Sequence, residues 1–177
     1  MALFSGKGDN GTTDAIDSTD RISKASPLPE ALGTLDELNA FLGFVRVRAQ
    51  GSERTVQIIR DTQEKLFIVQ AQLAGSPLAL PEGTVAAMEE AVNGIEDEIP
   101  PLKGFSIAGG TELSALLDVA RTNARRAERR ATAVHDAGIR EIPVETKAYL
   151  NRLSSLLFAL ARLANHEVGV PEENPRY

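Results

Sequence analysis

The chain of 177 residues has the length of one ordinary domain and can bury a substantial core. Its composition, 42% hydrophobic and 25% charged, is typical of a globular protein and not of a disordered or fibrous one. The formal net charge of −6 argues against nucleic acid as the main partner, because most of the surface would repel phosphates. Cysteine is absent, which excludes disulfides, thiolate metal sites and a cysteine nucleophile, and two histidines argue against a multi-histidine metal centre.

Residues 1–28 are polar and rich in Gly, Ser, Thr and Asp, without helical or strand periodicity. This pattern predicts an ordered loop or a flexible arm that precedes the first helix. The arm has no apolar signal-peptide core, and no apolar run of the chain is long enough to cross a bilayer. We therefore expect a cytoplasmic protein without a membrane partner.

Five segments beyond the arm carry apolar residues at the three- and four-residue steps of a helix face. The last of them is apolar around much of its circumference, which predicts a central helix or one covered by a neighbouring subunit. No segment gives a convincing strand signal, so we expect an all-α five-helix bundle in a single domain, with a bundle over 29–168 and a tail over 169–177. The predicted helices cover residues 29–49, the stretch from the N-cap Ser52 to the break at Gly75, 84–98, 111–137 and 144–168.

The fourth predicted helix contains five arginines between residues 120 and 130. At 100° per residue, part of this charge falls in a strip beside the apolar face. The guanidinium fork matches phosphate oxygens, so the strip is a candidate polyphosphate site. A solvated charged face, with the glutamate pairing its neighbours, explains the same residues, and the helix alone does not separate the two interpretations. The strip comprises Asp118, Arg121, Arg125, Glu128 and Arg129.

A glycine-rich stretch over residues 5–13 is a second candidate anion site. Its three glycines allow main-chain N–H groups to surround an anion, and Lys7, Thr12 and Thr13 add a charge and hydroxyl groups. It is not a Walker A loop, because the spacing before the Gly-Lys pair is wrong and no strand leads into it. A flexible terminus is the alternative. Lys24 is equally open to both interpretations.

Three further residues stand out against an apolar background. Asp36 lies at the edge of the apolar face of the first helix, where it either meets an arginine of another helix or subunit or has no special role. Asn151, within the apolar fifth helix, is either a satisfied core amide or a ligand contact. Phe105, in a Gly-rich loop, is either a plug over the core or part of a site.

Together these segments resemble the PduO-type ATP:corrinoid adenosyltransferases, in register from Ser5 to about Arg162. Several separated motifs in the right order are more specific than any one of them. The matching motifs are the loop at 5–13, Arg-x-Ser-Lys at 21–24, Glu-Ala-x-Gly-Thr-x-Asp-Glu-Leu-Asn at 30–39, Phe-x-x-x-Gly-Gly at 105–110, Ala-Arg-x-x-x-Arg-Arg-Ala-Glu-Arg-Arg at 120–130, and Tyr-Leu-Asn-Arg-Leu-Ser at 149–154.

The resemblance implies transfer of the 5′-deoxyadenosyl group of ATP to Co(I) of cobalamin or a related corrinoid, with release of triphosphate and with Mg²⁺. It implies a homotrimer with ATP between subunits, an arm that folds on binding at an entropic cost, and a flavin-type reductase and a cobalamin-dependent acceptor enzyme as partners. By carry-over, Asp36 pairs with Arg121 across the interface and Phe105 lies under the corrin. The ATP-binding residues implied are Ser5, Gly6, Lys7, Gly8, Thr13, Asp14, Lys24, Arg125, Arg126, Glu128, Arg129 and Asn151.

Two departures from the family pattern bear on nucleotide affinity and metal preference. The loop reads Ser5-Gly6-Lys7 where the family favours Thr-basic-Thr, and Asp118 stands where a histidine is usual, three residues before Arg121. Two other functions fit parts of the sequence. One is a noncatalytic nucleotide- or corrinoid-binding bundle that delivers cofactor to a partner. The other is an RNA-binding helix built on the arginines, which the acidic balance disfavours.

Overall fold

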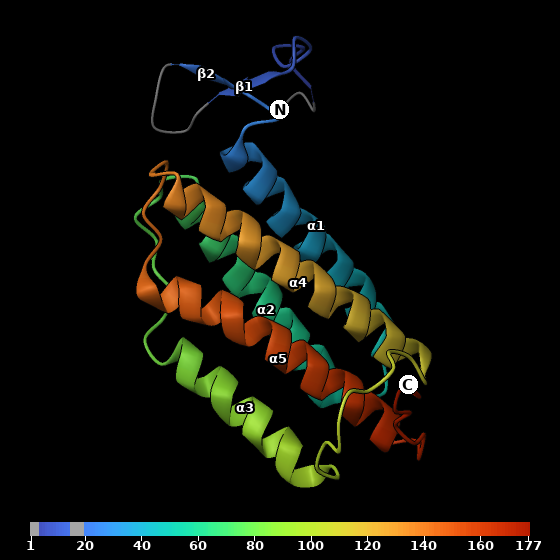
Figure 1. The fold of residues 1–177 in the computed structure, drawn as a ribbon. Helices are drawn as coiled ribbons and strands as arrows, with labels where there is room; N and C mark the ends of the chain where they lie inside the picture. Colours follow the sequence, from blue (N-terminus) through green and yellow to red (C-terminus); the bar gives the residue numbers. More distant parts are fainter. Residues whose placement is uncertain (1–3, 15–19) are drawn as a thin grey trace.

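The computed structural model describes residues 4–14 and 20–177, and parts of the predicted arm, 1–3 and 15–19, lie outside the described residues. The described chain forms a five-helix bundle preceded by a small hairpin (Figure 1). The predicted all-α fold is confirmed, and the predicted helix limits agree with the observed ones within about two residues. The helices are α1 (Pro27–Arg48), α2 (Glu53–Leu73), α3 (Thr84–Glu98), α4 (Glu112–Asp136) and α5 (Val144–His166).

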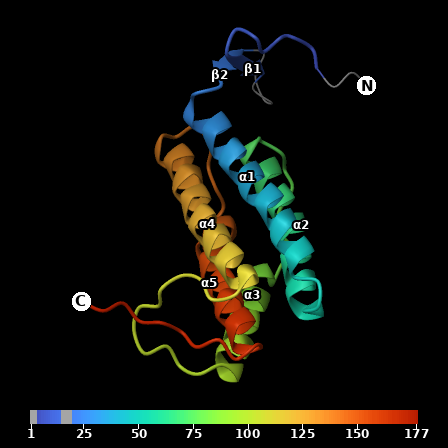
Figure 2. The same cartoon turned by 90° about the vertical axis from the view of Figure 1, so that its right-hand side faces the viewer.

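Helix α5 occupies the middle of the bundle. It packs against α3 on one side and α4 on the other, while α1 packs against both α2 and α4 (Figures 1 and 2). Its buried residues come from nearly all sides of the helix from Leu156 onward. The sequence left open whether a neighbouring subunit covers this helix, and the single chain already provides the cover.

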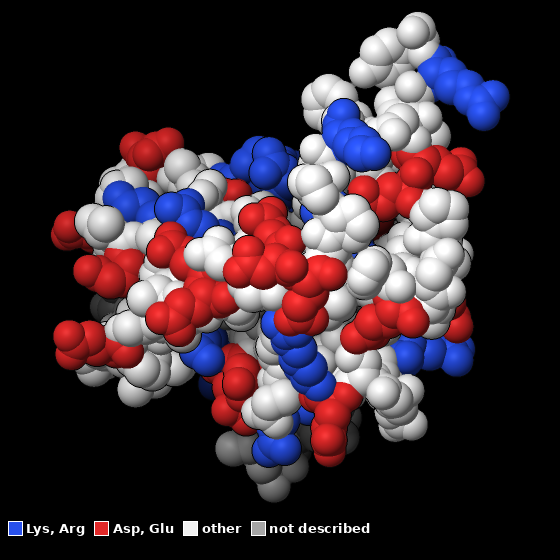
Figure 3. Space-filling view, turned by 90° about the horizontal axis from the view of Figure 1, so that it is seen from below, with Lys and Arg blue, Asp and Glu red and all other residues white. Residues whose placement is uncertain are grey.

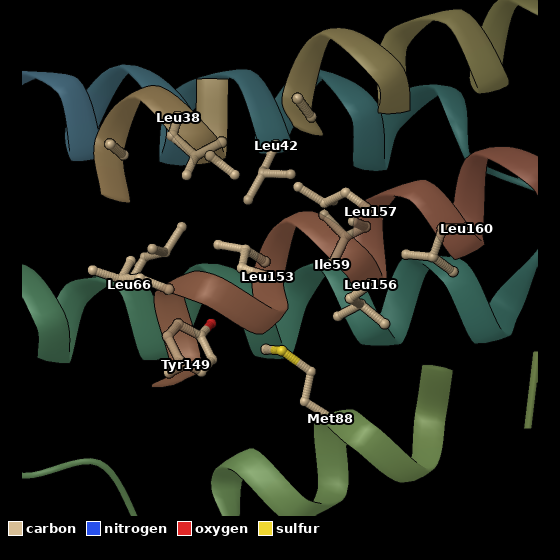
Figure 4. Close-up of a cluster of buried hydrophobic side chains, with 14 of the residues drawn as sticks. Leu38, Leu42, Ile59, Leu66, Met88, Tyr149, Leu153, Leu156, Leu157 and Leu160 are labelled. Carbon is tan, nitrogen blue, oxygen red and sulfur yellow. The ribbon is translucent and has the colours of Figure 1, made fainter. Parts of the chain in front are cut away.

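The core consists of leucines and isoleucines of α1, α2 and α5, with alanines from α4. Figure 4 shows Leu38 and Leu42 directed toward Leu157, and Met88 of α3 approaching from the opposite side. The α4 contribution is small side chains, which allow that helix to come close to α5. These fully buried alanines are Ala120, Ala124, Ala127 and Ala131.

Tyr149 is the largest fully buried side chain of the core. Its hydroxyl donates a long hydrogen bond of 3.4 Å to the carbonyl oxygen of Thr62. Burial raises the pKa of Tyr149 well above its ordinary value, and the bond to Thr62 opposes this weakly. The phenol therefore stays neutral at any pH at which the bundle works.

Helix starts differ in how they are capped. Thr111 precedes α4, and its Oγ1 accepts a hydrogen bond of 3.1 Å from the N–H of Ser114. Ser52 stands before α2 as predicted, but its side chain caps no main-chain group. Its hydroxyl donates instead to Oγ1 of Thr55, at 3.0 Å. The prediction that Ser52 is an N-cap was therefore right in position and wrong in its hydrogen bond.

The arm contains two short strands that the sequence did not predict. β1 (Thr12–Asp14) pairs antiparallel with β2 (Arg21–Ser23), with Thr13 opposite Ile22. Strands of three residues are too short to show a two-residue period, and such a hairpin alone is marginal in water. Arg21 supports it, because its Nη2 donates to the carbonyls of Lys7 (2.7 Å) and Thr12 (2.9 Å).

The hairpin projects beyond the start of α1 and stands clear of the other helices in both views (Figures 1 and 2). None of the described helices combines the length and the apolar character needed to cross a bilayer. The bundle thus presents α4 and α5 side by side, with the hairpin carried apart from them on the end of α1.

Replacement of Leu117 by alanine should destabilise the bundle strongly, because this α4 side chain is 0% exposed. Loss of its packing should lower the free energy of unfolding by about 2–5 kcal/mol, as measured by urea denaturation. Val119→Ala, at a position 46% exposed on the same helix, is the matched control and should change it by less than about 1 kcal/mol. Equal losses in the two variants would show that the faces of α4 are wrongly assigned.

Candidate functional site

A cleft opens where α4 and α5 meet the loop between α3 and α4. Its volume is about 390 Å³. Three of the predicted site residues, Phe105, Arg121 and Arg125, share this cleft although they come from two separated segments of the chain. The cleft therefore combines an aromatic ring with cationic groups. The complete lining is Leu102, Gly104, Phe105, Ser106, Arg121, Arg125, Ser154, Ser155 and Phe158.

Phe105 lies on the surface. It is 79% exposed, so it does not plug the core, and that interpretation is wrong. A large apolar ring left in water forgoes roughly 2–3 kcal/mol of burial free energy, which a ligand with an apolar face would recover. Its exposure at the mouth of a cleft is what a ligand contact requires.

Arg121 is held against the cleft wall by two neighbours. Its Nε donates to Oδ1 of Asp118 at 3.0 Å, and its guanidinium carbon lies 5.6 Å from the centre of the Phe158 ring. Asp118 is only 8% exposed, and Arg121 is the cation that pairs with it there. Asp118 thus lies deeper than the edge of the apolar face at which the sequence placed it.

The remaining arginines of α4 divide into two sets. Arg126 and Arg130 face α1: Nη2 of Arg126 lies 2.6 Å from Oε2 of Glu37, and Nε of Arg130 lies 3.3 Å from Oε1 of Glu30. The geometry of the first contact is that of an ion pair and not of a hydrogen bond. Arg125 and Arg129 are exposed and have neither hydrogen bond nor ion pair among the described residues. These two guanidiniums are available to an anion.

Asn151 is exposed on α5, so it is not a core amide. Its Nδ2 donates to Oε1 of Glu128 on α4 at 2.9 Å, and its Oδ1 accepts from Nη1 of Arg152 at 2.7 Å. Glu128 therefore contacts an amide and forms no ion pair with an arginine among the described residues. Asn151 and Glu128 together join α4 and α5 beside the exposed Arg125.

The predicted arm residues form a unit of their own. Nζ of Lys24 donates to the carbonyl of Gly8 at 2.9 Å, and a Cβ on Gly8 would lie 2.8 Å from that nitrogen. Only glycine leaves room for this approach. Asp14 forms an ion pair with Arg21 across the hairpin. The loop and its lysine therefore lie together, but the hairpin that carries them is separate from the cleft within one chain (Figure 1).

Asp36 is exposed and has neither hydrogen bond nor ion pair among the described residues, while Arg121 already pairs with Asp118. The single chain therefore does not bring Asp36 and Arg121 into contact. The remaining predicted residues, Ser5, Gly6, Lys7 and Thr13, all belong to the loop and the hairpin, where the hydroxyl of Ser5 accepts from the N–H of Lys7 at 3.4 Å.

Sequence reasoning missed the α5 side of the cleft. Ser155 and Phe158 follow Asn151 by four and seven residues and so lie on the same helix face. That spacing was a usable signal, but the apolar character of α5 assigned Phe158 to the core. Asn165 was also missed. Its side chain accepts from the N–H of Thr111 at 2.9 Å and donates to the carbonyl of Gly109 at 2.8 Å, which fixes the end of the Phe105 loop.

Residues 3–164 match a family model described as cobalamin adenosyltransferase. The chain belongs to this family. It is 38% identical over 175 residues to the corrinoid adenosyltransferase PduO of Citrobacter freundii, a match that covers 94% of this chain but 51% of the relative, so the chain spans about half the length of that protein. It is 36% identical to the corrinoid adenosyltransferase of Mycobacterium tuberculosis, over 92% of this chain and 88% of the relative.

Solved structures of the family share the fold closely. A variant of the PduO-type ATP:corrinoid adenosyltransferase from Lactobacillus reuteri, complexed with cobalamin and ATP, superposes with a TM-score of 0.90 at 28% identity, over 99% of this chain and 100% of that one. A second variant of that protein, complexed with ATP, gives a TM-score of 0.88 at 29% identity, over 98% and 100% of the two chains.

Alanine at Gly110 should destabilise the protein more than alanine at Gly109. Both glycines have positive φ, +125° at Gly109 and +104° at Gly110, so each substitution costs about 1–3 kcal/mol of backbone strain. A Cβ at Gly110 would also lie 2.5 Å from Oδ1 of Asn165, whereas one at Gly109 meets nothing within 4 Å. Urea denaturation should show the larger loss for Gly110→Ala, and equal losses would mean that Asn165 moves aside freely.

Proposed function

We propose that this protein transfers the 5′-deoxyadenosyl group of ATP to Co(I) of cobalamin or a related corrinoid. The observation that carries the proposal is the single cleft in which the exposed ring of Phe105 meets the guanidiniums of Arg121 and Arg125. An aromatic surface suits the apolar face of a corrin, and the cations suit a polyphosphate. Family membership and the resemblance to proteins complexed with both compounds support the same conclusion.

In the proposed reaction Co(I) attacks the 5′ carbon of ATP, a Co–C bond forms, and the C–O bond to the triphosphate breaks. The electron pair of the broken bond leaves with the triphosphate, so no protein nucleophile is needed. The chain contributes orientation and electrostatics. Arg125 and Arg129, which have no partner within residues 4–14 and 20–177, stabilise the negative charge that grows on the leaving oxygen.

The ATP site is completed by a second subunit in this proposal. The loop that contains Gly8 and Lys24 stands apart from its own α4, so the hairpin of one subunit would meet Arg125 and Asn151 of a neighbour (Figure 2). A homotrimer with three such sites is the assembly we propose. Asp36 is exposed, and Arg121 uses only its Nε on Asp118. The other N–H groups of Arg121 can therefore donate to the carboxylate of Asp36 of a neighbouring subunit.

The metal ion of the proposed reaction is Mg²⁺ bound to the triphosphate. Residues 4–14 and 20–177 contain no group of three or more His, Asp or Glu side chains suited to a metal. Mg²⁺ commonly keeps several waters and takes phosphate oxygens with one or two carboxylates, so this donor set fits a nucleotide-borne ion. Glu128, beside the arginines, would supply a carboxylate to it or to its waters.

Co(I) must be produced by reduction, so the reaction requires an electron donor from outside the chain. A flavin-type reductase is the class of partner we propose, and a cobalamin-dependent enzyme would receive the product. We place the reaction in the cytoplasm, where both ATP and such a reductase are present.

Arg125→Ala should weaken ATP use without weakening the fold, because Arg125 is exposed and bonds to none of the residues that the structure describes. Loss of a charged phosphate contact should lower kcat/KM for ATP by roughly tenfold or more. Formation of the light-sensitive Co–C bond is followed anaerobically with chemically reduced cobalamin. Arg130→Ala, on the same helix but directed to Glu30, is the control and should keep wild-type ATP kinetics. ATP kinetics that stay unchanged in Arg125→Ala would remove this arginine from the site.

Phe105→Ala should slow turnover most when the assay begins from Co(II). A ring beneath the corrin excludes a lower axial ligand, which lowers the energy of the orbital that receives the electron. With preformed Co(I) the defect should be much smaller, and the KM for ATP should stay near the wild-type value. Because Phe105 is exposed, the melting temperature should not change. A sharply lower melting temperature with equal defects in both assays would assign the ring a structural role.

The alternative of a noncatalytic carrier makes an opposite prediction, because it binds ATP or corrinoid and forms no Co–C bond. RNA binding is less consistent with the surface. On the face shown in Figure 3, Asp and Glu gather across the middle, and Lys and Arg lie between them. Binding to RNA that falls steeply with salt would favour that alternative.

A further inference from the structure

The loop that carries Phe105 is held by the C-terminal tail, residues 167–177. The N–H of Ile107 donates to the carbonyl of Glu173 at 2.8 Å, and Nδ2 of Asn174 donates to the carbonyl of Phe105 itself at 2.8 Å. Figure 2 shows the loop and the tail running side by side at the end of the bundle. Because the Phe105 ring is exposed, these main-chain contacts and not core packing determine where it lies.

The tail is in turn fixed to α5 by a buried charge. Arg162 is 8% exposed, forms an ion pair with Glu172, and donates from Nη2 to the carbonyl of Pro100 at 2.7 Å. One guanidinium thus ties the start of the loop and the tail to the central helix. A buried cation that lost its partner would be strongly unfavourable, so Glu172 has little freedom to leave.

Hydrogen bonds join the tail to the loop. A cavity of about 330 Å³ lies beside this junction, lined in part by Pro101, Lys103, Val170 and Asn174. Among the side chains that the structure describes, only Asn174 bonds to Phe105 directly. The bond of Asn174 is therefore the side-chain contact through which the tail can set the position of Phe105.

We propose that the tail is a working part of the corrinoid site, in which Asn174 is a positioning residue for Phe105 and the Arg162–Glu172 pair holds the tail in place. The family model matches residues 3–164, so the tail lies beyond the part of the chain that the family description covers. The inference rests on the proposed function, because it gives the tail a role through the ring that faces the corrin.

The test measures corrinoid affinity in a double-mutant cycle. Asn174→Ala should raise the dissociation constant for Co(II) cobalamin, titrated anaerobically in the presence of ATP, by roughly three- to tenfold, the effect of one lost hydrogen bond. The KM for ATP and the melting temperature should not change. If Asn174 acts through Phe105, the same substitution should have no further effect in the Phe105→Ala background. Arg176→Ala, two residues further along the tail, is the control and should keep wild-type affinity.

Equal losses in the two backgrounds, or no loss in either, would overturn the proposal. Hydrogen–deuterium exchange gives a second readout that does not depend on activity. Peptides containing Phe105 and Ile107 should exchange faster in Asn174→Ala and in Glu172→Gln than in the wild-type protein, and exchange that stays unchanged in both would also overturn it. A wild-type protein that forms no Co–C bond would instead refute the proposed function, and the exchange result would then decide alone whether the tail holds the loop.

Discussion

The close approach of α4 to α5 is the constraint on which the rest of the structure depends. It is possible because α4 presents alanine at Ala120, Ala124, Ala127 and Ala131, where a larger side chain would push the helices apart. The arginines of α4 alternate with these alanines in sequence. The alanine face of α4, which packs against the bundle, thus determines that Arg121 and Arg125 lie at the edge of the contact between α4 and α5. The same sequence repeat on α4 determines both the helix packing and the positions of the arginines. A change in the positions of these charges would therefore also change the core.

Two partly buried ion pairs lie near the Phe105 loop and have similar roles. Asp118 holds Arg121 at the cleft wall, and Glu172 holds Arg162 against Pro100. Such pairs contribute little net stability, since desolvation offsets most of their attraction. These pairs contribute orientation. Each pair fixes the position of one guanidinium, that of Arg121 on α4 and that of Arg162 on α5. A neighbouring group that has no core packing is positioned through this guanidinium.

Much of the bundle could be predicted because its signals are local. Proline and glycine mark the ends of the helices. A long segment whose apolar residues recur with a period of 3.6 still predicts a helix when a single residue departs from the pattern. The hairpin could not be predicted, since Arg21 joins main-chain groups nine and fourteen residues away and three-residue strands show no period. The site was found in part. The arginines could be recognised as a cluster in the sequence. The roles of Asn165 and Phe158 depend instead on which segments the fold brings beside them. A polar residue in an apolar segment does not indicate which group it will bond.

The hairpin bears on how the proposed ATP site would hold the nucleotide. The family resemblance implies an arm that folds when ATP binds. Within the chain itself, the paired strands, the bonds of Arg21 and the contact of Lys24 with Gly8 shape the loop over residues 5–13. A loop with more of its contacts made within the chain loses less conformational entropy on binding, so more of the interaction free energy appears as affinity. In the proposed site, a loop held by these bonds can select the triphosphate by shape as well as by charge.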